Sequence, residues 1–298
     1  MKTATTKPLI YAAEAWTADE QGSLRPTSSF QDLPSSLSKQ IVERTTSRAA
    51  PIVAKVEDLE STNGAANHFN ALVGLPVIKT NQIVGCTVLA ISCSADSMGA
   101  FEIWHRDERD ELGLNGAVFS GLSRFASISQ HVRFPRGSGL PGQSWEDSEA
   151  KLLTGLGSSP NFMRAAGARA GGLDIGVALP FFKTEHDLNS VVLLLSATSS
   201  PISRVFEIWD VSGETATIRK AAGDLETATI AEVNDIEYKR GEGIVGKVWE
   251  SGLPMVSDDL AAVGRKRLGS LMADGFSSVI AMPVTVGNRI ESIFVMFN

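Results

Sequence analysis

Apolar and polar residues alternate with a period of two along much of the chain, most clearly in its last third. Residues 206–210 and 217–222 alternate in this way on either side of a turn, which predicts a β-hairpin. Residues 278–286 and 289–297 are two further apolar strands, joined by the Gly-Asn pair at 287–288 that is typical of a two-residue hairpin turn. Strands are therefore expected to open and close this stretch.

Between these hairpins the apolar spacing is mostly helical. We expect a helix over 224–236, a short helix that ends near Gly252, a brief strand over 253–256 and a helix that ends at Gly275. Asp258 and Asp259 are N-cap candidates for that last helix, because short polar side chains accept hydrogen bonds from free N–H groups. Its apolar residues are Leu260, Leu268, Leu271 and Met272.

The same order of elements recurs along the chain. The tetrapeptide Phe-Glu-Ile-Trp at 101–104 returns at 206–209, and a glycine-rich segment ending in tryptophan occupies both 137–145 and 241–249. A weaker copy, Ala-Glu-Ala-Trp, stands at 13–16. The repeat predicts three related units of about 100 residues each. We place them at 1–97 (unit one), 98–203 (unit two) and 204–298 (unit three).

Unit one is the degenerate copy, because it lacks the glycine-rich segment and has a predicted helix over 36–47 in its place. A proline recurs in one of the last strands of every unit, at Pro76, Pro180 and Pro283. Proline cannot donate to a strand ladder, so each is expected at an edge position or a bulge.

The linkers between units are short, at about 94–100 and 197–205. They allow two arrangements, in which strands pair within each unit or the last strand of one unit pairs with the first of the next. We favour units that close on themselves and touch tightly. The order of elements gives an α+β fold class, with a mainly antiparallel sheet flanked by helices in each unit.

Composition narrows the function classes. Of the 298 residues, 43% are hydrophobic and 20% charged, as in ordinary globular proteins, and the formal net charge of −7 argues against nucleic acid and anionic membranes. No apolar run approaches the roughly 20 residues of a membrane span, and a signal peptide is not expected. Two cysteines exclude a disulfide framework and a thiolate zinc site. We expect a cytoplasmic protein without a cofactor.

The glycine-rich segment at 137–142 has the Gly-x-Gly-x-x-Gly spacing of a dinucleotide-binding loop. That function needs a buried parallel strand before it, and residues 133–136 (Arg-Phe-Pro-Arg) do not read as one. A tight turn that lets a helix start against the sheet is the favoured interpretation.

Residues 134–145, 160–166, 172–173 and 178–180 of unit two, and the corresponding segments of unit three, resemble a GAF domain. The resemblance implies a central antiparallel sheet with a small-molecule pocket between the sheet and the facing helices. It also implies a regulatory function. The chain departs from the family pattern, because its short linkers leave no room for the long terminal helices of GAF domains and no output segment is visible.

Three residues are candidates for ligand binding in unit two. Phe162 and Arg164 lie on the helix expected to cover the pocket, where Arg164 is able to reach an anionic ligand bidentately. Trp145 follows the glycine-rich turn. The alternative is structural, with Arg164 as a surface or helix-packing residue and Trp145 in the core. The four histidines are scattered, and we predict no catalytic residue and no metal site.

The leading hypothesis is a non-enzymatic, small-molecule-sensing or regulatory GAF-type protein without its own output domain. Its partners would be a small-molecule ligand in unit two and either further copies of the same chain in a homo-oligomer or a signalling protein. The alternative is a scaffold or oligomerisation module with filled cores and no ligand. A redox enzyme of the GAF-type methionine sulfoxide reductase class is third, because it needs paired cysteines near the pocket, whereas Cys86 and Cys93 lie toward the end of unit one.

Overall fold

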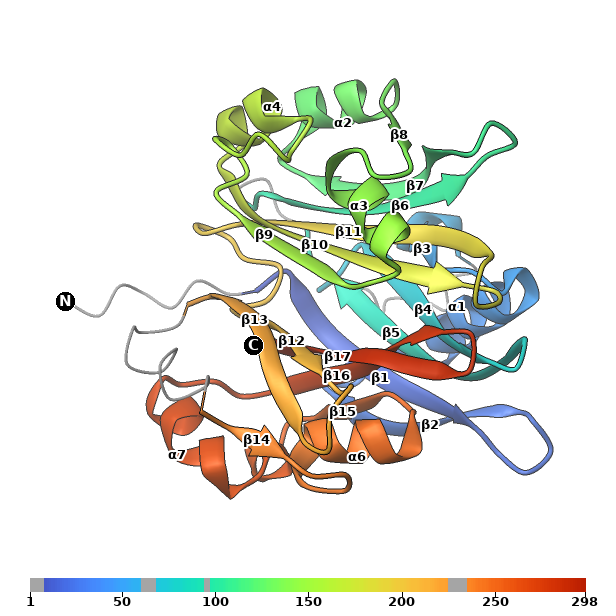
Figure 1. Cartoon of the computed structure of the whole chain (residues 1–298), viewed down its shortest axis with the longest axis vertical. Helices are drawn as coiled ribbons and strands as arrows, with labels where there is room; N and C mark the ends of the chain where they lie inside the picture. Colours follow the sequence, from blue (N-terminus) through green and yellow to red (C-terminus); the bar gives the residue numbers. More distant parts are fainter. Residues whose placement is uncertain (1–7, 60–67, 94–96, 225–234) are drawn as a thin grey trace.

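A computed structural model describes residues 8–59, 68–93, 97–224 and 235–298, apart from the side chains at 265, 267 and 268. In these residues the strands form three antiparallel sheets, and each sheet draws all its strands from one of the three predicted units (Figure 1). The first strand of each unit pairs with its last strand, so the strands pair within units rather than between them.

Unit one contains a five-stranded sheet in the order β2-β1-β5-β4-β3. Its strands are β1 (Ile10–Ala18), β2 (Leu24–Phe30), β3 (Ile52–Lys55), β4 (Ala71–Lys79) and β5 (Gln82–Ile91). Helix α1 (Ser35–Arg48) covers β4 and β5, and a single 3₁₀ turn, η1, follows β3 at Val56–Asp58. The helix predicted over 36–47 is therefore confirmed.

Unit two contains a six-stranded sheet in the order β8-β7-β6-β11-β10-β9. Its strands are β6 (Gly99–Arg106), β7 (Glu111–Ser120), β8 (Arg133–Pro135), β9 (Lys151–Thr154), β10 (Leu173–Phe182) and β11 (Leu188–Ala197). Its helices are α2 (Ser123–Ser129), α3 (Gly139–Asp147) and α4 (Ala165–Ala170). Helix α3 lies on β10 and β11, the place that α1 takes in unit one.

Unit three repeats this sheet in the order β14-β13-β12-β17-β16-β15. Its strands are β12 (Val205–Asp210), β13 (Ala216–Gly223), β14 (Glu237–Tyr238), β15 (Met255–Ser257), β16 (Val279–Val286) and β17 (Arg289–Phe297). Its helices are α6 (Gly243–Ser251), the 3₁₀ helix η2 (Leu260–Val263) and α7 (Arg265–Ala273).

Most predicted elements of unit three are confirmed, and one is wrong. Both hairpins form, with Val286 paired to Arg289 across the Gly-Asn turn. The helix expected up to Gly275 is broken, because Gly264 adopts a φ of 93° that separates η2 from α7. Met272, expected on its apolar face, is 63% exposed. The helix expected over 224–236 falls mostly on 225–234, outside the described residues.

The glycine-rich segment forms the expected tight turn. Strand β8 before it is antiparallel to β7, which is not the parallel strand that a dinucleotide site requires. Gly137 and Gly139 have φ values of 79° and 62°, and a Cβ at Gly142 would collide with the carbonyl oxygen of Pro135. The turn therefore needs glycine for its backbone and starts helix α3 close to the sheet.

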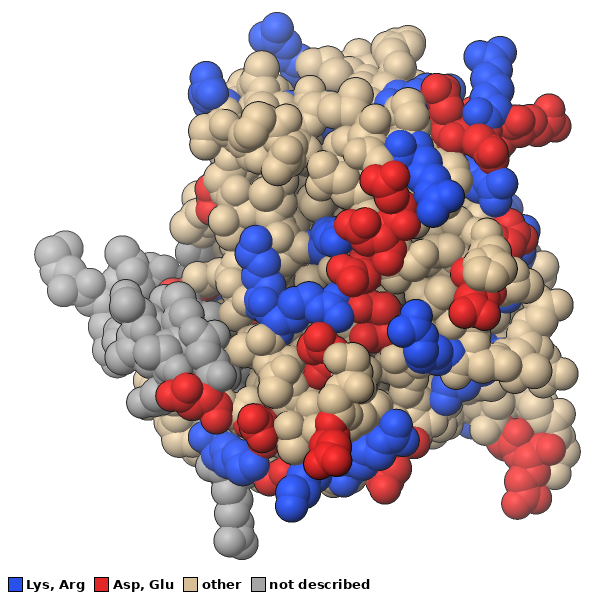
Figure 2. Space-filling model, viewed as in Figure 1, with Lys and Arg blue, Asp and Glu red and all other residues tan. Residues whose placement is uncertain are grey.

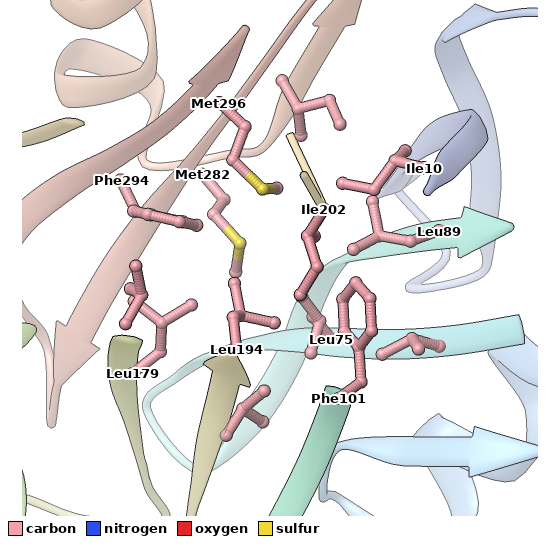
Figure 3. Close-up of a cluster of buried hydrophobic side chains, with 14 of the residues drawn as sticks. Ile10, Leu75, Leu89, Phe101, Leu179, Leu194, Ile202, Met282, Phe294 and Met296 are labelled. Carbon is pink, nitrogen blue, oxygen red and sulfur yellow. The ribbon is translucent and has the colours of Figure 1, made fainter. Parts of the chain in front are cut away.

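Each sheet has two buried faces. The outer face is covered by the helices of its own unit, and the inner face meets the inner faces of the other two sheets (Figure 1). Figure 3 shows this shared cluster, in which Phe101, Leu194, Met282, Phe294 and Leu75 from all three units point toward one another. The cluster contains strand and loop residues and, among those described, no helical residue.

The sheets also touch at their edges in a cyclic order. Strand β3 of unit one contacts β7 of unit two, β9 of unit two contacts β13 of unit three, and β15 of unit three contacts β2 of unit one. Each contact joins the edge strand β3, β9 or β15 of one unit to the second strand of the next unit, so the three units form a closed ring with approximate threefold symmetry. The contact is heterologous, because two different strands meet in it, and after three such contacts the last unit meets the first.

The recurrent prolines lie around the centre of this ring. Pro76 lies on β4 beyond the end of its neighbour β3, Pro180 on β10 beyond β9, and Pro283 on β16 beyond β15. At these positions the edge of β4, β10 or β16 that faces the shorter strand has no ladder partner among the described residues. A register shift follows each proline within a few residues. All three line one small cavity of about 10 Å³. Both expectations for these prolines, a free strand edge and a bulge, are met.

Candidate functional site

A buried carboxylate and a tryptophan mark the outer face of every sheet. They stand two residues apart on the first strand, so their side chains point to the same side. The indole Nε1 donates to the glutamate at 2.8 Å in the Trp16–Glu14 pair, 2.9 Å in Trp104–Glu102 and 2.9 Å in Trp209–Glu207. Burying a carboxylate is costly unless it is paired and hydrogen-bonded, so each copy needs polar partners beneath the helices.

In unit two the carboxylate of Glu102 has a charged partner. The two terminal nitrogens of Arg164 donate to the two oxygens of Glu102, at 2.6 Å and 2.7 Å. One of these nitrogens also donates to the hydroxyl of Ser129, which in turn donates to the carbonyl oxygen of Phe125. The side chain of Arg164 is only 2% exposed and that of Glu102 is fully buried. This bidentate geometry is the strongest form of the Arg–carboxylate pair.

Four aromatic rings enclose the guanidinium group of Arg164. Its central carbon lies 4.5 Å from the ring centroid of Phe125, 5.1 Å from Trp104, 5.4 Å from Phe162 and 5.6 Å from Phe134. Rings at these distances attract a cation through their negative faces, and more strongly where water is excluded. We call these four rings, with Glu102 and Ser129, the unit-two cage.

The cage is assembled from both layers of the unit. The sheet supplies Glu102 and Trp104 from β6 and Phe134 from β8, and helix α2 supplies Phe125 and Ser129. Phe162 and Arg164 come from the turns that precede α4, with Arg164 as the N-cap residue at φ −104° and ψ 29°. The cage therefore lies between the sheet and its covering helices, where the GAF resemblance places a small-molecule pocket.

One donor in the cage has no partner. The Nε of Arg164 is buried and makes no hydrogen bond within the described structure. A buried N–H without an acceptor costs about 1–3 kcal/mol. The guanidinium therefore fits the carboxylate and the rings well but leaves one of its donors unsatisfied.

Unit one handles its carboxylate differently. Burial raises the pKa of Glu14 above its usual 4.5, while hydrogen bonds from Trp16 and Ser38 oppose that rise and the nearby Asp32 adds to it. Hydroxyl and indole groups supply the hydrogen bonds on this carboxyl, whereas in unit two a guanidinium donates to the carboxylate beside the indole.

The structure brings two of the three candidate residues together. Phe162 belongs to the cage and Arg164 fills it, whereas the ring of Trp145 has the guanidinium of Arg106 over it, at 5.6 Å from the ring centroid. The ligand-binding role of these three residues stays a prediction. Arg164 was expected to reach an anionic ligand, and here its terminal nitrogens bind Glu102 and Ser129.

Sequence reasoning missed Glu102 and the rings of Phe125 and Phe134. A signal for Glu102 was present, because glutamate precedes tryptophan by two residues in all three units. No comparable signal marks Phe125 or Phe134, which reach the cage only through the packing of α2 and β8.

An open, charged cleft of about 410 Å³ lies at one end of the same sheet, between the β6–β7 and β10–β11 turns. Arg106 crosses it to form ion pairs with Asp110 at 2.7 Å and Asp187 at 3.2 Å. Burial lowers the pKa of His105 on its wall, and Lys183 lowers it further. Figure 2 shows basic and acidic side chains intermixed across the face of the molecule in view, without a large area of one sign.

The two cysteines lie in different places. Cys86 packs under α1 on the outer face of the first sheet, where burial raises the pKa of its thiol to about 12. Cys93 packs against the shared inner cluster, and burial also raises its pKa. Neither environment favours the thiolate that redox chemistry uses. The described residues contain no cluster of ligands suited to a metal ion, and no helix among them is long and apolar enough to cross a membrane.

No family model matches this chain. No curated protein matches it either. It is similar to solved structures over about one unit each, among them the following three. The A. aeolicus nlh2 GAF domain in an inactive state is 26% identical, with 33% of this chain and 58% of that chain covered and a TM-score of 0.27. A GAF domain/HD domain protein from Geobacter sulfurreducens is 14% identical, with coverages of 36% and 67% and a TM-score of 0.29.

The third structure is the free methionine-R-sulfoxide reductase from Neisseria meningitidis in complex with its substrate. It is 18% identical, with 36% of this chain and 55% of that chain covered and a TM-score of 0.26. This chain thus spans little more than half the length of the A. aeolicus and Neisseria structures. The similarity is to a GAF-like fold within one unit.

Proposed function

We propose that this chain is a non-enzymatic regulatory protein of GAF type that binds a small molecule in unit two. The observation that carries the proposal is the unit-two cage. Its charged and hydroxyl groups converge at Glu102 inside an apolar enclosure between sheet and helices. A few polar groups that converge among hydrophobic and aromatic side chains are the usual lining of a small-molecule site.

The chemistry of the cage supports binding rather than catalysis. Arginine does not release its proton in proteins, so Arg164 is unsuited to general acid–base work. Both oxygens of Glu102 already accept hydrogen bonds. The redox alternative is weaker still, because the two thiols lie on opposite faces of the first sheet and both have raised pKa values.

A second candidate function is the scaffold, and one observation favours it. The guanidinium of Arg164 already occupies the space above Glu102, and the inner faces of the sheets are buried against one another. In that case the protein would act through its outer surface, which would bind other copies of the same chain or a signalling protein.

Native mass spectrometry followed by a thermal-shift screen separates the two functions. The freshly purified chain is weighed for bound mass and oligomeric state, and then screened against cationic, anionic and neutral metabolites. Sensing predicts a ligand whose shift in Tm is lost in Phe162→Ala and kept in the control Met272→Ser, which changes an exposed residue of unit three. No bound mass and no shift with any class would leave the scaffold as the function.

A further inference from the structure

We infer that the unit-two cage recognises an organic cation, the guanidinium or alkylammonium group of a small ligand, and that Arg164 is a tethered competitor for the same place. This inference rests on the proposed sensing function. It replaces the anionic ligand that the sequence suggested, and it makes Arg164 the occupant of the site instead of its recognition element.

The charges of the cage determine the class of ligand. Its fixed charge is the carboxylate of Glu102, which β6 holds between β7 and β11 in the middle of the sheet. Four rings turn toward the centre of the guanidinium at 4.5–5.6 Å. A carboxylate below aromatic faces attracts a cation and repels an anion. An anion bound to Arg164 at this place would lie against Glu102.

The attachment of Arg164 permits exchange. It lies outside the sheet, at the N-cap of the six-residue helix α4, after a run of turns without a regular element. The residue before it, Met163, is 56% exposed. Opening this segment breaks no strand ladder but must break the buried pair with Glu102, so the open cage is a minor state of the wild type. Arg164 is thus able to swing into water without breaking a strand.

The fit of Arg164 is also incomplete. Its Nε is buried without an acceptor, a cost that disappears when the side chain moves into solvent. A free cation must compete with a side chain tethered beside the site, so the apparent affinity of the cation falls in proportion to the fraction of molecules with an open cage. Removing Arg164 should therefore expose a receptor that the wild type largely hides.

The experiment measures binding of methylguanidinium chloride by calorimetry, with tryptophan fluorescence as a second signal because Trp104 forms one wall. Sodium chloride at equal ionic strength and sodium methyl phosphate serve as the salt and anion controls. The proteins are the wild type, Arg164→Ala, Arg164→Ala with Glu102→Ala, and Arg124→Ala. Arg124 is a matched control because it is an exposed arginine of the covering helix α2.

We expect the wild type and Arg124→Ala to bind methylguanidinium equally and weakly, and Arg164→Ala to bind it at least tenfold more tightly. Removing Glu102 as well should abolish binding, and methyl phosphate should bind none of the variants through this site. If Arg164→Ala is too unstable to purify, Arg164→Lys replaces it. Lysine keeps the charge but loses the planar fork, so it should compete less well and give several-fold tighter binding than the wild type.

Three results would overturn the inference. The first is equal affinity of the wild type and Arg164→Ala for methylguanidinium, and the second is binding that survives the loss of Glu102. The third is binding to Arg164→Ala with none to the wild type, which would mean that Arg164 never leaves the cage. An anionic or neutral ligand found in the metabolite screen would refute this inference and leave sensing intact. No ligand of any class would refute both.

Discussion

The two faces of each sheet have different roles. The inner faces meet in one hydrophobic cluster to which all three units contribute residues. The outer faces are closed locally by the helices of each unit and carry the buried Glu–Trp pairs. A sheet face that packs against other units needs a complementary shape and a large apolar area. A face covered by the helices of its own unit is able to hold charged groups as well. Assembly and candidate chemistry are therefore separated by the thickness of one sheet.

The largest effect is expected from a charge on the inner face. Leu194→Asp places a carboxylate at a position that is 1% exposed, opposite Phe101 and between units. Because a buried unpaired charge is among the most damaging changes, unfolding free energy should fall by at least about 4 kcal/mol in urea titrations. Ile128→Asp, at a 40% exposed outer position, is the control and should change little. A Leu194→Asp protein as stable as wild type would contradict the shared core.

The next effect concerns the outer face of unit two. Glu102→Ala leaves the guanidinium of Arg164 buried without its carboxylate, which should cost roughly 3–5 kcal/mol. Glu102→Leu with Arg164→Met removes both charges and should cost much less, because it leaves neither one uncompensated. Urea denaturation of Glu102→Leu, Arg164→Met and the double variant gives the coupling energy. Additive losses would mean that the two side chains do not act as a pair.

The pH dependence of stability tests the outer face of unit one. Burial raises the pKa of Glu14 in the folded chain above its unfolded value, so its contribution is fully present below the unfolded pKa and is lost as pH rises toward the folded pKa. Glu14→Gln should therefore gain stability relative to wild type as the pH increases from 4.5 upward. Thermal unfolding across this range measures the difference between the two proteins. A constant difference would show that Glu14 titrates normally.

The smallest effect is expected at a local helix cap in unit three. The carboxylate of Asp259 accepts a hydrogen bond from the backbone N–H of Ala261 at 2.9 Å. Asp259→Ala should lower the unfolding free energy by about 1 kcal/mol, the usual value of an N-cap. Asp258→Ala is the matched control, since this exposed neighbour was an equal candidate in the sequence. Equal losses in both variants would place the cap elsewhere.

The hairpins and turns of this chain could be predicted because their causes are local. A Gly-Asn turn fixes the β16–β17 connection. The glycines of the 137–142 segment adopt positive φ values or lie too close to the backbone for a Cβ, which other residues do not tolerate. The break at Gly264 was missed, because a single glycine inside a helical pattern does not by itself end a helix. Phe162 and Arg164 could be assigned to the cover of unit two, whereas the carboxylate of Glu102 beneath them was missed although the repeated Glu-x-Trp pattern marks it.

By itself the sequence determined the order of the repeated segments, the antiparallel hairpins of unit three and the glycine turns, since these follow from spacing and backbone sterics. Only the tertiary structure decided that the three inner faces close into a ring and that Glu102 meets Arg164 in a cage of four rings. These contacts join residues far apart in the chain. Alternation shows that a strand has two faces but does not show what covers each of them.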